Sequence, residues 1–535
     1  MSGIGKGVAS SSIGKILQAK GFSVNLVKVD PYLNVDAGTM NPTEHGEVFV
    51  LNSGLECDQD MGNYERFLGK DLENEDYMTS GMVYRHVIEK ERNLGYKGKC
   101  VEAIPHITEE IKRRLKLSAE KNASDISVVE IGGTVGDYQN MMFIESARML
   151  ALQNPGDVLF ILVSYLPVPG TIGEMKTKPT QNSVRMLNSY GVQPHIILGR
   201  GPLPLDQKRK EKIAISCSVP PENVISAPDI ESIYDVPINF EKENMAEILL
   251  KNLGLKSRVK KDGLVAWRKF VAGTKNAKGE ARIAVIGKYF DTGDFVLSDA
   301  YISIIEALKF SAYKLGRKPK LTWLNSKDIE TGKTPVSSLA GFDGLLVPGG
   351  FGESGIEGKI KAIQFARENK VPYLGLCYGM QLMVIEYARN VAGIKNATTS
   401  EIDPGAENPV IDIMPDQKAK LSEGRYGATM RLGAYPAVLQ DGTLARTAYK
   451  SETISERHRH RYEVNPKYIA RLEGAGLVFS GRSPDGALME VAELPRNNHP
   501  FFMGTQFHPE FKARPLSPHP LFTEFIRVAI GRNNK

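Results

Sequence analysis

Cys377 stands in the pentapeptide Gly375-Leu376-Cys377-Tyr378-Gly379, between an apolar run and the helical stretch MQLMVIEYARN. A strand–turn–helix of this kind exposes the side chain at the bend, and glycines stand where the backbone is crowded. The N-terminus of a helix also favours a thiolate, because its dipole and its free N–H groups stabilise negative charge. The pattern predicts a nucleophilic cysteine.

This interpretation depends on partners, because a lone cysteine is more often a small buried apolar residue. A second apolar run, PFFMGTQF, leads into His508 and Glu510. Alternation along a strand would place both on one face, where the carboxylate can orient the imidazole as a general base. Upstream, the glycines of residues 348–352 can turn a backbone N–H toward an oxyanion, with the N–H of Tyr378 as second donor. The spacing therefore predicts a Cys–His–Glu triad.

Over roughly residues 282–535, these features resemble the class I glutamine amidotransferase family, whose members release ammonia from glutamine through a thioester. The resemblance implies that Cys377, His508 and Glu510 are catalytic and that Gly350 contributes an oxyanion or glutamine contact. Tyr378 stands where the family more often has leucine, which leaves the backbone donor intact.

The first residues of the chain form a glycine-rich loop followed by a helical run. Gly3, Gly5 and Gly7 surround Lys6, which is typical of a loop that cradles phosphate, although Ser or Thr usually follows the lysine. Glu130 ends the apolar run ISVVE, at a position where strand-terminal acids hold Mg²⁺ beside a phosphate loop. Any single acid could equally be a solvated or helix-capping carboxylate.

The order of several motifs along the chain is more specific than the loop. They are SGIGKGVASSSIG, KVDPYLNVDAGTMNPTEHGEVFV, GNYERF, VVEIGGTVGD, GEMKTKPTQNSV, ERHRHRYEVN and QFHPEF. In this combination the chain resembles the CTP synthase family, nearly end to end. The resemblance implies ATP-dependent phosphorylation of O4 of UTP, followed by displacement of the phosphate by ammonia from glutamine. This is the final step of de novo CTP synthesis.

The resemblance also implies roles for individual residues, with Lys6 holding the transferring phosphoryl group and Lys28 near it. The residues implied for ATP are Gly3, Ile4, Gly5, Lys6, Gly7, Val8, Asp60 and Asp229, and those for Mg²⁺ are Asp60 and Glu130. Those for UTP or CTP are Ser2, Asp137, Gln139, Lys176, Lys178, Gln181 and Lys212. Those for glutamine are Gly350, Tyr378, Gln381, Glu401 and Arg459. GTP as activator, CTP as feedback inhibitor and a homotetramer are implied as well. Gln139 departs from the family, which usually has glutamate there.

The elements that must position these residues follow from the apolar runs. In the first half, runs at 23–30, 127–133, 158–166 and 195–200 alternate with amphipathic helical stretches. This alternation predicts a parallel α/β sheet with ligands at the carboxyl ends of its strands. A second α/β series follows, with runs at 282–290, 342–352 and 371–377. We expect a P-loop-like amidoligase domain over 1–252, a basic linker over 253–281 ending in the loop-like GTKNAKGEA, and a glutaminase domain over 282–535.

Composition sets the broad class. A chain of 535 residues is too long for one core, and 41% hydrophobic with 24% charged residues is typical of a globular protein. The net charge of +6 includes no dense basic run, so no nucleic-acid partner is expected. Four widely spaced cysteines favour a reducing compartment. The apolar runs are too short for a membrane span and no signal peptide is visible, so we expect a cytoplasmic protein.

Two alternatives remain open. Phosphate loops normally follow a buried strand, whereas here the loop opens the chain, and in the CTP synthase family a short apolar strand and a Gly-Gly pair precede it. We therefore expect the first strand to be missing, and an inactive truncated paralogue retained for assembly is possible. The other alternative is an ATP-dependent amidotransferase of the cobyrinic acid amide synthase type, which is not expected to carry KTKPTQ. A partitioning P-loop NTPase would have no use for the cysteine triad.

Overall fold

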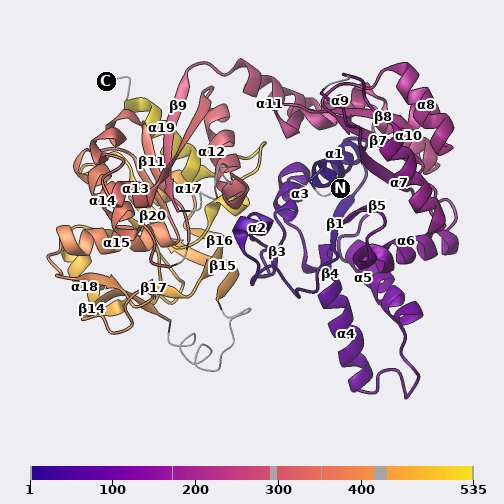
Figure 1. Cartoon of the computed structure of the whole chain (residues 1–535). Coiled ribbons are helices and arrows are strands. Elements are labelled where there is room, and N and C mark those ends of the chain that lie inside the picture. Colours follow the sequence, from indigo (N-terminus) through magenta and orange to yellow (C-terminus); the bar gives the residue numbers. More distant parts are fainter. Residues whose placement is uncertain (1–2, 171–172, 289–297, 351, 415–429, 533–535) are drawn as a thin grey trace. The chain divides into compact units, whose positions relative to one another are not determined.

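The computed structural model describes residues 3–170, 173–288, 298–350, 352–414 and 430–532 (Figure 1). The chain divides into two compact units. The first unit contains residues 1–36 and 63–271, and the second contains residues 37–62 and 272–535. The division does not follow chain order, because a segment near the N-terminus belongs with the C-terminal half. No helix in these described ranges has the length and apolarity needed to cross a membrane.

The first unit contains two parallel sheets, which confirms the predicted α/β class. Their strand orders are β4-β1-β5 and β6-β7-β8. The strands are β1 (Val24–Asp30), β4 (Tyr77–Thr79), β5 (Ile126–Ile131), β6 (Ile161–Tyr165), β7 (Ile196–Gly201) and β8 (Val224–Pro228). Four of them lie at the predicted apolar runs. The expectation of a further strand ahead of the phosphate loop stays a prediction.

The helices of this unit pack their apolar faces on the strands. Ile13, Ile16 and Leu17 have helical i, i+3, i+4 spacing and lie in one buried cluster with β1 and β7. All residues of β1 are buried, as expected for a strand with a neighbour on each side. The helices are α1 (Lys6–Ala19), α3 (Asp60–Leu68), α4 (Ser80–Arg92), α5 (Thr108–Lys121), α6 (Met141–Gln153), α7 (Lys178–Ser189), α8 (Gln207–Cys217), α9 (Val236–Lys242) and α10 (Met245–Asn252).

The stretch expected to be a linker contains a helix, α11 (Val265–Asn276). The loop expected at its end is therefore partly wrong, since residues 273–276 are helical. The helix forms because Trp267 buries its ring beside Tyr234 and Phe67 and donates its indole N–H to the carbonyl of Tyr234 at 2.8 Å. The domain boundaries stay a prediction.

The second unit is built on a nine-stranded sheet of order β10-β9-β11-β12-β20-β19-β18-β15-β16. Pairing is parallel from β10 to β20 and antiparallel from β20 to β16. Its strands are β9 (Glu280–Gly287), β10 (Lys318–Asn325), β11 (Gly344–Val347), β12 (Tyr373–Leu376), β15 (Arg431–Leu439), β16 (Thr453–His460), β18 (Val478–Arg482), β19 (Met489–Glu493) and β20 (Phe502–Thr505). A small sheet contains β13 (Ala397–Thr399), β14 (Asn408–Ile413) and β17 (Tyr462–Val464).

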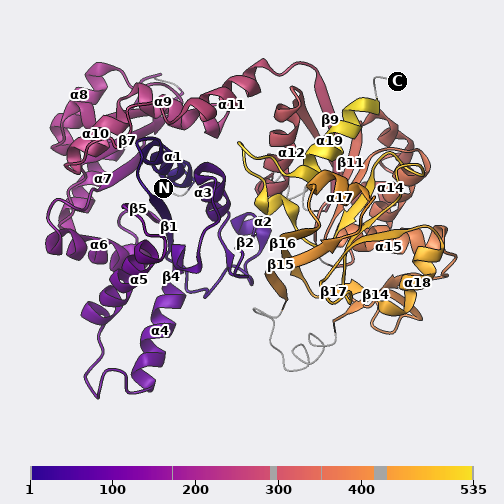
Figure 2. The ribbon, with the colours of Figure 1, turned by 180° about the vertical axis from the view of Figure 1, so that it is seen from behind.

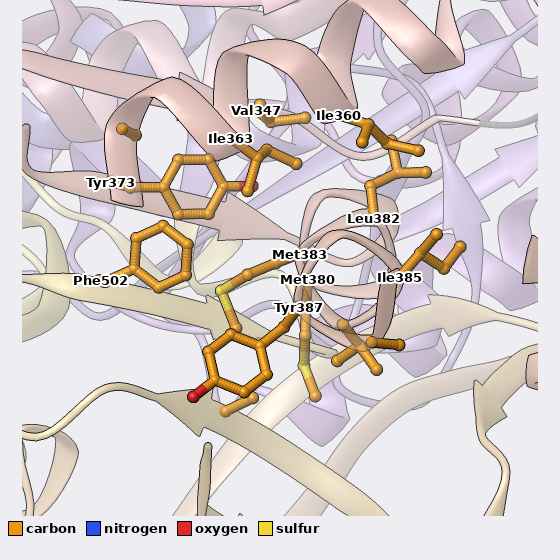
Figure 3. Close-up of a cluster of buried hydrophobic side chains, with 14 of the residues drawn as sticks. Val347, Ile360, Ile363, Tyr373, Met380, Leu382, Met383, Ile385, Tyr387 and Phe502 are labelled. Carbon is orange, nitrogen blue, oxygen red and sulfur yellow. The ribbon is translucent and has the colours of Figure 1, made fainter. Parts of the chain in front are cut away.

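Helices supply the apolar residues that complete this core (Figure 3). Met380, Met383 and Tyr387 of one helix lie in one buried cluster with Tyr373 and Phe502 of two adjacent strands. The helices are α12 (Ile302–Lys314), α13 (Ser326–Glu330), α14 (Ile356–Glu368), α15 (Tyr378–Asn390), α17 (Leu444–Tyr449), α18 (Pro466–Gly474) and α19 (Pro520–Arg532).

Residues 37–62 add a short helix, α2 (Pro42–His45), and a small hairpin of β2 (Phe49–Val50) and β3 (Glu56–Cys57). The hairpin lies beside β15 and β16, far from it in sequence (Figure 2). Ala434 donates its N–H to the carbonyl of Asn52 at 2.8 Å. A Cβ on Gly54 would lie 2.8 Å from the carbonyl oxygen of Leu432, so a side chain there would displace backbone.

Candidate active site

The predicted elbow is present at Cys377, between β12 and α15. Its φ of 51° and ψ of −102° are unusual for a residue with a side chain, and its N–H donates to the carbonyl of Thr505 at 2.6 Å. Both flanking glycines are required. A Cβ on Gly375 would lie 2.7 Å from the backbone of Gly379, and one on Gly379 would lie 2.2 Å from the carbonyl oxygen of Val347. The turn therefore fixes the sulfur at the start of a helix.

His508 and Glu510 are paired, with Nδ1 of the imidazole donating to Oε1 of the carboxylate at 2.7 Å. The strand expected to place them is wrong at this point, because β20 ends at Thr505 and residues 509–512 form a 3₁₀ turn. Pro509 lacks the N–H that a sheet would require, so the strand cannot continue through it. The turn brings the carboxylate of Glu510 back to the imidazole of His508. The predicted pairing is therefore present, but a turn rather than a strand produces it.

The imidazole of His508 is poised toward the cysteine. Gly349 lies between them, since a Cβ there would be 2.8 Å from Cε1 of His508 and 3.6 Å from Cβ of Cys377. Burial lowers the pKa of His508, but the neighbouring side chains of Glu510 and Cys377 raise it, and the result is about 10. Nε2 of His508 has no hydrogen-bond partner among the described residues. The arrangement favours a protonated imidazole beside the cysteine.

A polar cluster surrounds the glycine loop that follows β11. The N–H of Gly352 donates to Oε1 of Glu401 at 3.0 Å, and Lys288 approaches Gly352. Burial raises the pKa of Glu401, although the Gly352 N–H and Lys288 oppose the shift. Tyr378 is buried above Lys359, whose Nζ is 5.4 Å from the centre of the ring. The structure thus brings together the predicted glutamine residues Gly350, Tyr378 and Glu401.

Lys359 is absent from the residues predicted by sequence. Its side chain is buried, and a Cβ on Gly350 would lie 4.0 Å from its Nζ. Burial lowers the pKa of Lys359 to about 7, Lys288 acts in the same direction, and Glu401 opposes them. The sequence signal was its position, because Lys359 lies on the same helix face as Ile356 and Ile363, which periodicity predicts to be buried, whereas a lysine is normally exposed.

Gln381 and Arg459, the other predicted glutamine residues, both contact the elbow residue Cys377 through backbone groups. Gln381 donates to the carbonyl of Tyr462 at 2.9 Å and to Gln506 at 3.3 Å. The carbonyl oxygen of Arg459 accepts a hydrogen bond from the Cys377 sulfur at 3.7 Å. Nε of the Arg459 side chain pairs with Glu56 at 2.8 Å.

The glycine loop that is predicted to bind phosphate leads into α1. Gly5 has a φ of 83° at the N-cap, which favours glycine, and the helix begins at Lys6. Nζ of Lys6 donates to the carbonyl of Gly133 at 2.9 Å, beyond the end of β5. Gly3, Ile4, Gly7 and Val8 therefore form the loop and the first turn, where free N–H groups suit an anion. Ser2 lies outside the described residues.

Arg200, which sequence reasoning missed, connects this loop to β8. Its Nε donates to the carbonyl of Ile4 at 3.1 Å, and its Nη2 pairs with Asp229 at 2.9 Å. The predicted ATP residue Asp229 is thereby linked to the loop. A signal was available, because Arg200 ends the apolar run HIILGR, at the carboxyl end of a parallel strand.

Glu130 lies in a charged cluster at the same sheet edge. Its Oε1 is 3.1 Å from Nζ of Lys28, its Oε2 accepts from Tyr64 at 2.5 Å, and Lys28 is 3.5 Å from Asp30. Carboxylate oxygens of this kind suit Mg²⁺, which takes few protein ligands and keeps its water and phosphate ligands. Within the described residues no three His, Cys, Asp or Glu side chains form a closed metal site. Asp60, the other predicted ligand, begins α3, and the boundary between the two units falls within this helix, after Gly62.

The residues predicted for the pyrimidine nucleotide lie around the start of α7, in the middle of α8 and in the segment between β5 and α6. Lys176 pairs with Glu174 at 2.7 Å, and this contact, together with the nearby Lys212, lowers the pKa of Glu174. Lys178 begins α7, and Gln181 donates to Thr177 at 3.2 Å. Asp137 accepts from the N–H of Thr134 at 2.9 Å, while Gln139 is exposed.

Comparison with known proteins covers the whole chain. Residues 1–255 match the family described as CTP synthase N-terminus, and residues 296–528 match glutamine amidotransferase class-I. A CTP synthase of Caldanaerobacter subterraneus subsp. tengcongensis is 48% identical over 532 residues, covering 99% of this chain and 97% of the relative. A CTP synthase of Thermococcus gammatolerans is 49% identical over 534 residues, covering 99% and 97%.

Among solved structures, the glutaminase domain of a Trypanosoma brucei CTPS with bound acivicin is 35% identical, with a TM-score of 0.43. It covers 47% of this chain and 94% of that domain. The full-length relatives are similar along both the phosphate-loop unit and the cysteine unit, which excludes a family that shares only one of the two. The chain belongs to the CTP synthase family.

Proposed function

We propose that this chain aminates UTP to CTP, using ATP and the ammonia that it releases from glutamine. The observation that carries the proposal is the elbow cysteine beside a paired His–Glu, on a chain whose first unit holds a phosphate loop. A rival of the cobyrinic acid amide synthase type does not fit the full-length similarity to CTP synthases. An inactive paralogue would have no need of the His508–Glu510 pair beside the elbow cysteine.

In the glutaminase reaction, the Cys377 thiolate attacks the δ-carbonyl carbon of glutamine. The developing oxyanion accepts from the backbone N–H groups of Tyr378 and Gly350, the first of which has no acceptor within the helix. His508 donates its proton to the departing nitrogen, so that ammonia leaves and a thioester remains. Water then hydrolyses the thioester to glutamate, with His508 as base and Glu510 orienting it.

Glutamine itself is held by its charged ends. We assign its ammonium to Glu401 and its carboxylate to Arg459, since these are a half-buried acid that contacts the glycine loop and a half-buried guanidinium whose backbone contacts the elbow. Gln381 fixes Gln506, which in turn donates toward the Cys377 sulfur at 3.7 Å.

In the first unit, phosphoryl transfer depends on position and on charge neutralisation. Lys6, at the N-terminus of α1, neutralises the transferring phosphoryl group, and Lys28 lies at the same sheet edge. Glu130 and Asp60 would hold Mg²⁺, which supplies further neutralisation of phosphate charge. Lys176, Lys178, Gln181 and Lys212 would bind UTP, and Asp229 lies on the adenine side of the ATP site. Ammonia then displaces the phosphate from C4 of the pyrimidine.

The decisive experiment separates the two reactions. Cys377→Ala should abolish CTP formation from glutamine and leave formation from added ammonia largely intact, because the elbow only makes ammonia. Lys6→Ala should remove both. A folded Cys377→Ala protein that lost ammonia-dependent synthesis would contradict the assignment of separate sites.

Regulation follows from the family. We propose GTP as activator, CTP as feedback inhibitor, a homotetramer and a cytoplasmic location. Gln139 replaces an acid that in the family helps recognise CTP, and its amide loses a charge-assisted hydrogen bond of roughly 1–2 kcal/mol. Inhibition by CTP should therefore be stronger in Gln139→Glu than in the natural sequence, and equal inhibition constants would remove this idea.

A further inference from the structure

The hairpin of residues 49–57 reaches the catalytic histidine through a row of aromatic rings. The ring of Phe49 meets the ring of Phe511 edge to face, with centroids 5.1 Å apart. Phe511 in turn stacks on the imidazole of His508, with centroids 5.2 Å apart and planes 20° apart. Phe49 and Phe511 are both buried, so this row leaves the imidazole little room to rotate.

A second connection runs through β16. Arg457 is fully buried, donates to Asn52 at 2.7 Å and to the carbonyl of Val50 at 3.1 Å, and lies over the ring of Phe49 at 5.3 Å. The carbonyl of Arg457 accepts the N–H of His508 at 2.7 Å. The side chain of one residue therefore holds the hairpin while its backbone holds the catalytic base.

Arg459, two residues along the same strand, likewise contacts the hairpin through its side chain and Cys377 through its backbone. Its guanidinium pairs with Glu56, whose side chain is 2% exposed, and its carbonyl contacts the Cys377 sulfur at 3.7 Å. Strand β16 is thus placed between the hairpin and the nucleophile–base pair.

We propose that the hairpin of residues 49–57 is the positioning element of the glutaminase, with Phe49 orienting His508 through Phe511 and Glu56 orienting Arg459 for glutamine. The inference rests on the proposed glutaminase function. Neither Phe49 nor Glu56 touches the reacting atoms. Because they act on different steps, they have different kinetic signatures. Phe49 governs the geometry of proton transfer, and Glu56 governs the geometry of substrate binding.

The test measures glutamine-dependent and ammonia-dependent CTP formation by the full chain. Phe49→Leu should lower kcat for glutamine roughly ten- to hundredfold, because a small misplacement of a catalytic group costs that much. KM for glutamine and the ammonia-dependent rate should change little. Phe479→Leu is the matched control, since Phe479 is an equally buried ring in the same unit, packed in the core away from the hairpin. It should leave kcat unchanged at a similar loss of thermal stability.

A double-mutant cycle identifies the route. Phe49→Leu and Phe511→Leu act on one ring contact, so the double variant should lose little more than the worse single variant, whereas independent effects would multiply. Multiplying effects, or an equal loss of ammonia-dependent activity in Phe49→Leu, would overturn the proposal.

Glu56→Gln tests the other end of the hairpin. Loss of the charged partner of Arg459 should raise KM for glutamine about tenfold and leave kcat at saturation nearly unchanged. An effect on kcat alone, or none on KM, would refute the assignment of Glu56. If Cys377→Ala retained glutamine-dependent synthesis, the proposed function would fail instead, and the two failures are therefore distinguishable.

Discussion

At the scale of single residues, the space between Cys377 and His508 is set by Gly349. Because an added Cβ would lie 2.8 Å from Cε1 of His508, Gly349→Ala should push the imidazole away from the sulfur. We expect kcat for glutamine hydrolysis to fall about a hundredfold, with ammonia-dependent synthesis retained. Steady-state kinetics with each nitrogen source checks this, and unchanged kcat would mean that the imidazole has room to shift.

The sequence was sufficient to predict that an elbow cysteine and a His–Glu pair come together, but not to predict the residues that confine them. Cys377, His508 and Glu510 could be predicted because their types and their places after apolar runs carry the chemistry. Gly349 and Lys359 could not, since one acts by having no side chain and the other by being buried where a lysine is normally exposed. Both depend on which segments meet in three dimensions.

At the scale of elements, His499 joins α14 to the start of β20. The N–H of Phe501 donates to its Nδ1 at 3.2 Å, so its Nε2 carries the proton and donates to the carbonyl of Ala366 at 3.0 Å. Burial lowers the pKa of His499 to about 4 from an ordinary value of 6.5, while the two backbone contacts oppose the shift.

This neutral histidine makes the second unit sensitive to acid. Between pH 6.5 and 4 the unfolded chain binds a proton that the folded chain does not, so stability is lost as pH falls through this window. The loss from this group should be about 3 kcal/mol. His499→Gln should be less stable at neutral pH but lose less stability on acidification, as measured by denaturant unfolding at pH 7 and pH 4.5. Parallel losses in both proteins would contradict the assignment.

A helix or strand was predictable from sequence where the apolar pattern within that one segment determines its structure. The buried strands β1, β7 and β12 could be recognised as apolar runs, and α1 by its apolar periodicity. The prediction that the strand continues through Pro509 was wrong, because it considered only the alternation of side chains and not the missing N–H of proline. The helix α11 was missed because its stability comes from Trp267 packing on Tyr234, a partner distant in sequence.

At the scale of the whole molecule, the second unit takes a segment from the N-terminal third of the chain. No sequence pattern in residues 37–62 indicates that they pack with residues 272–535, because the hairpin is joined in sequence to residues of the other unit. A fragment of residues 272–535 alone would lack Phe49 and so expose the part of the Phe511 ring that Phe49 covers. It would also leave Arg457 without its acceptors at Asn52 and Val50.

We expect this fragment to melt at a lower temperature than the corresponding transition of the full chain and to hydrolyse glutamine more slowly. A peptide of residues 37–62, added in trans, should restore part of both. Calorimetry and a glutamate assay measure the two effects, and a fragment as stable and as active as the full chain would show that the segment is dispensable.

The backbone of Cys377 has a consequence for how this protein can be improved. Its φ of 51° and ψ of −102° cost a residue with a Cβ of order 1–3 kcal/mol, while glycine adopts them freely. Cys377→Gly should therefore have a higher melting temperature than Cys377→Ala, although both lack the sulfur. If so, the proposed nucleophile occupies a position where selection for turnover opposes selection for stability, and screens for thermostable variants will tend to discard the cysteine. Engineering for heat resistance should hold this position fixed and seek its gains elsewhere.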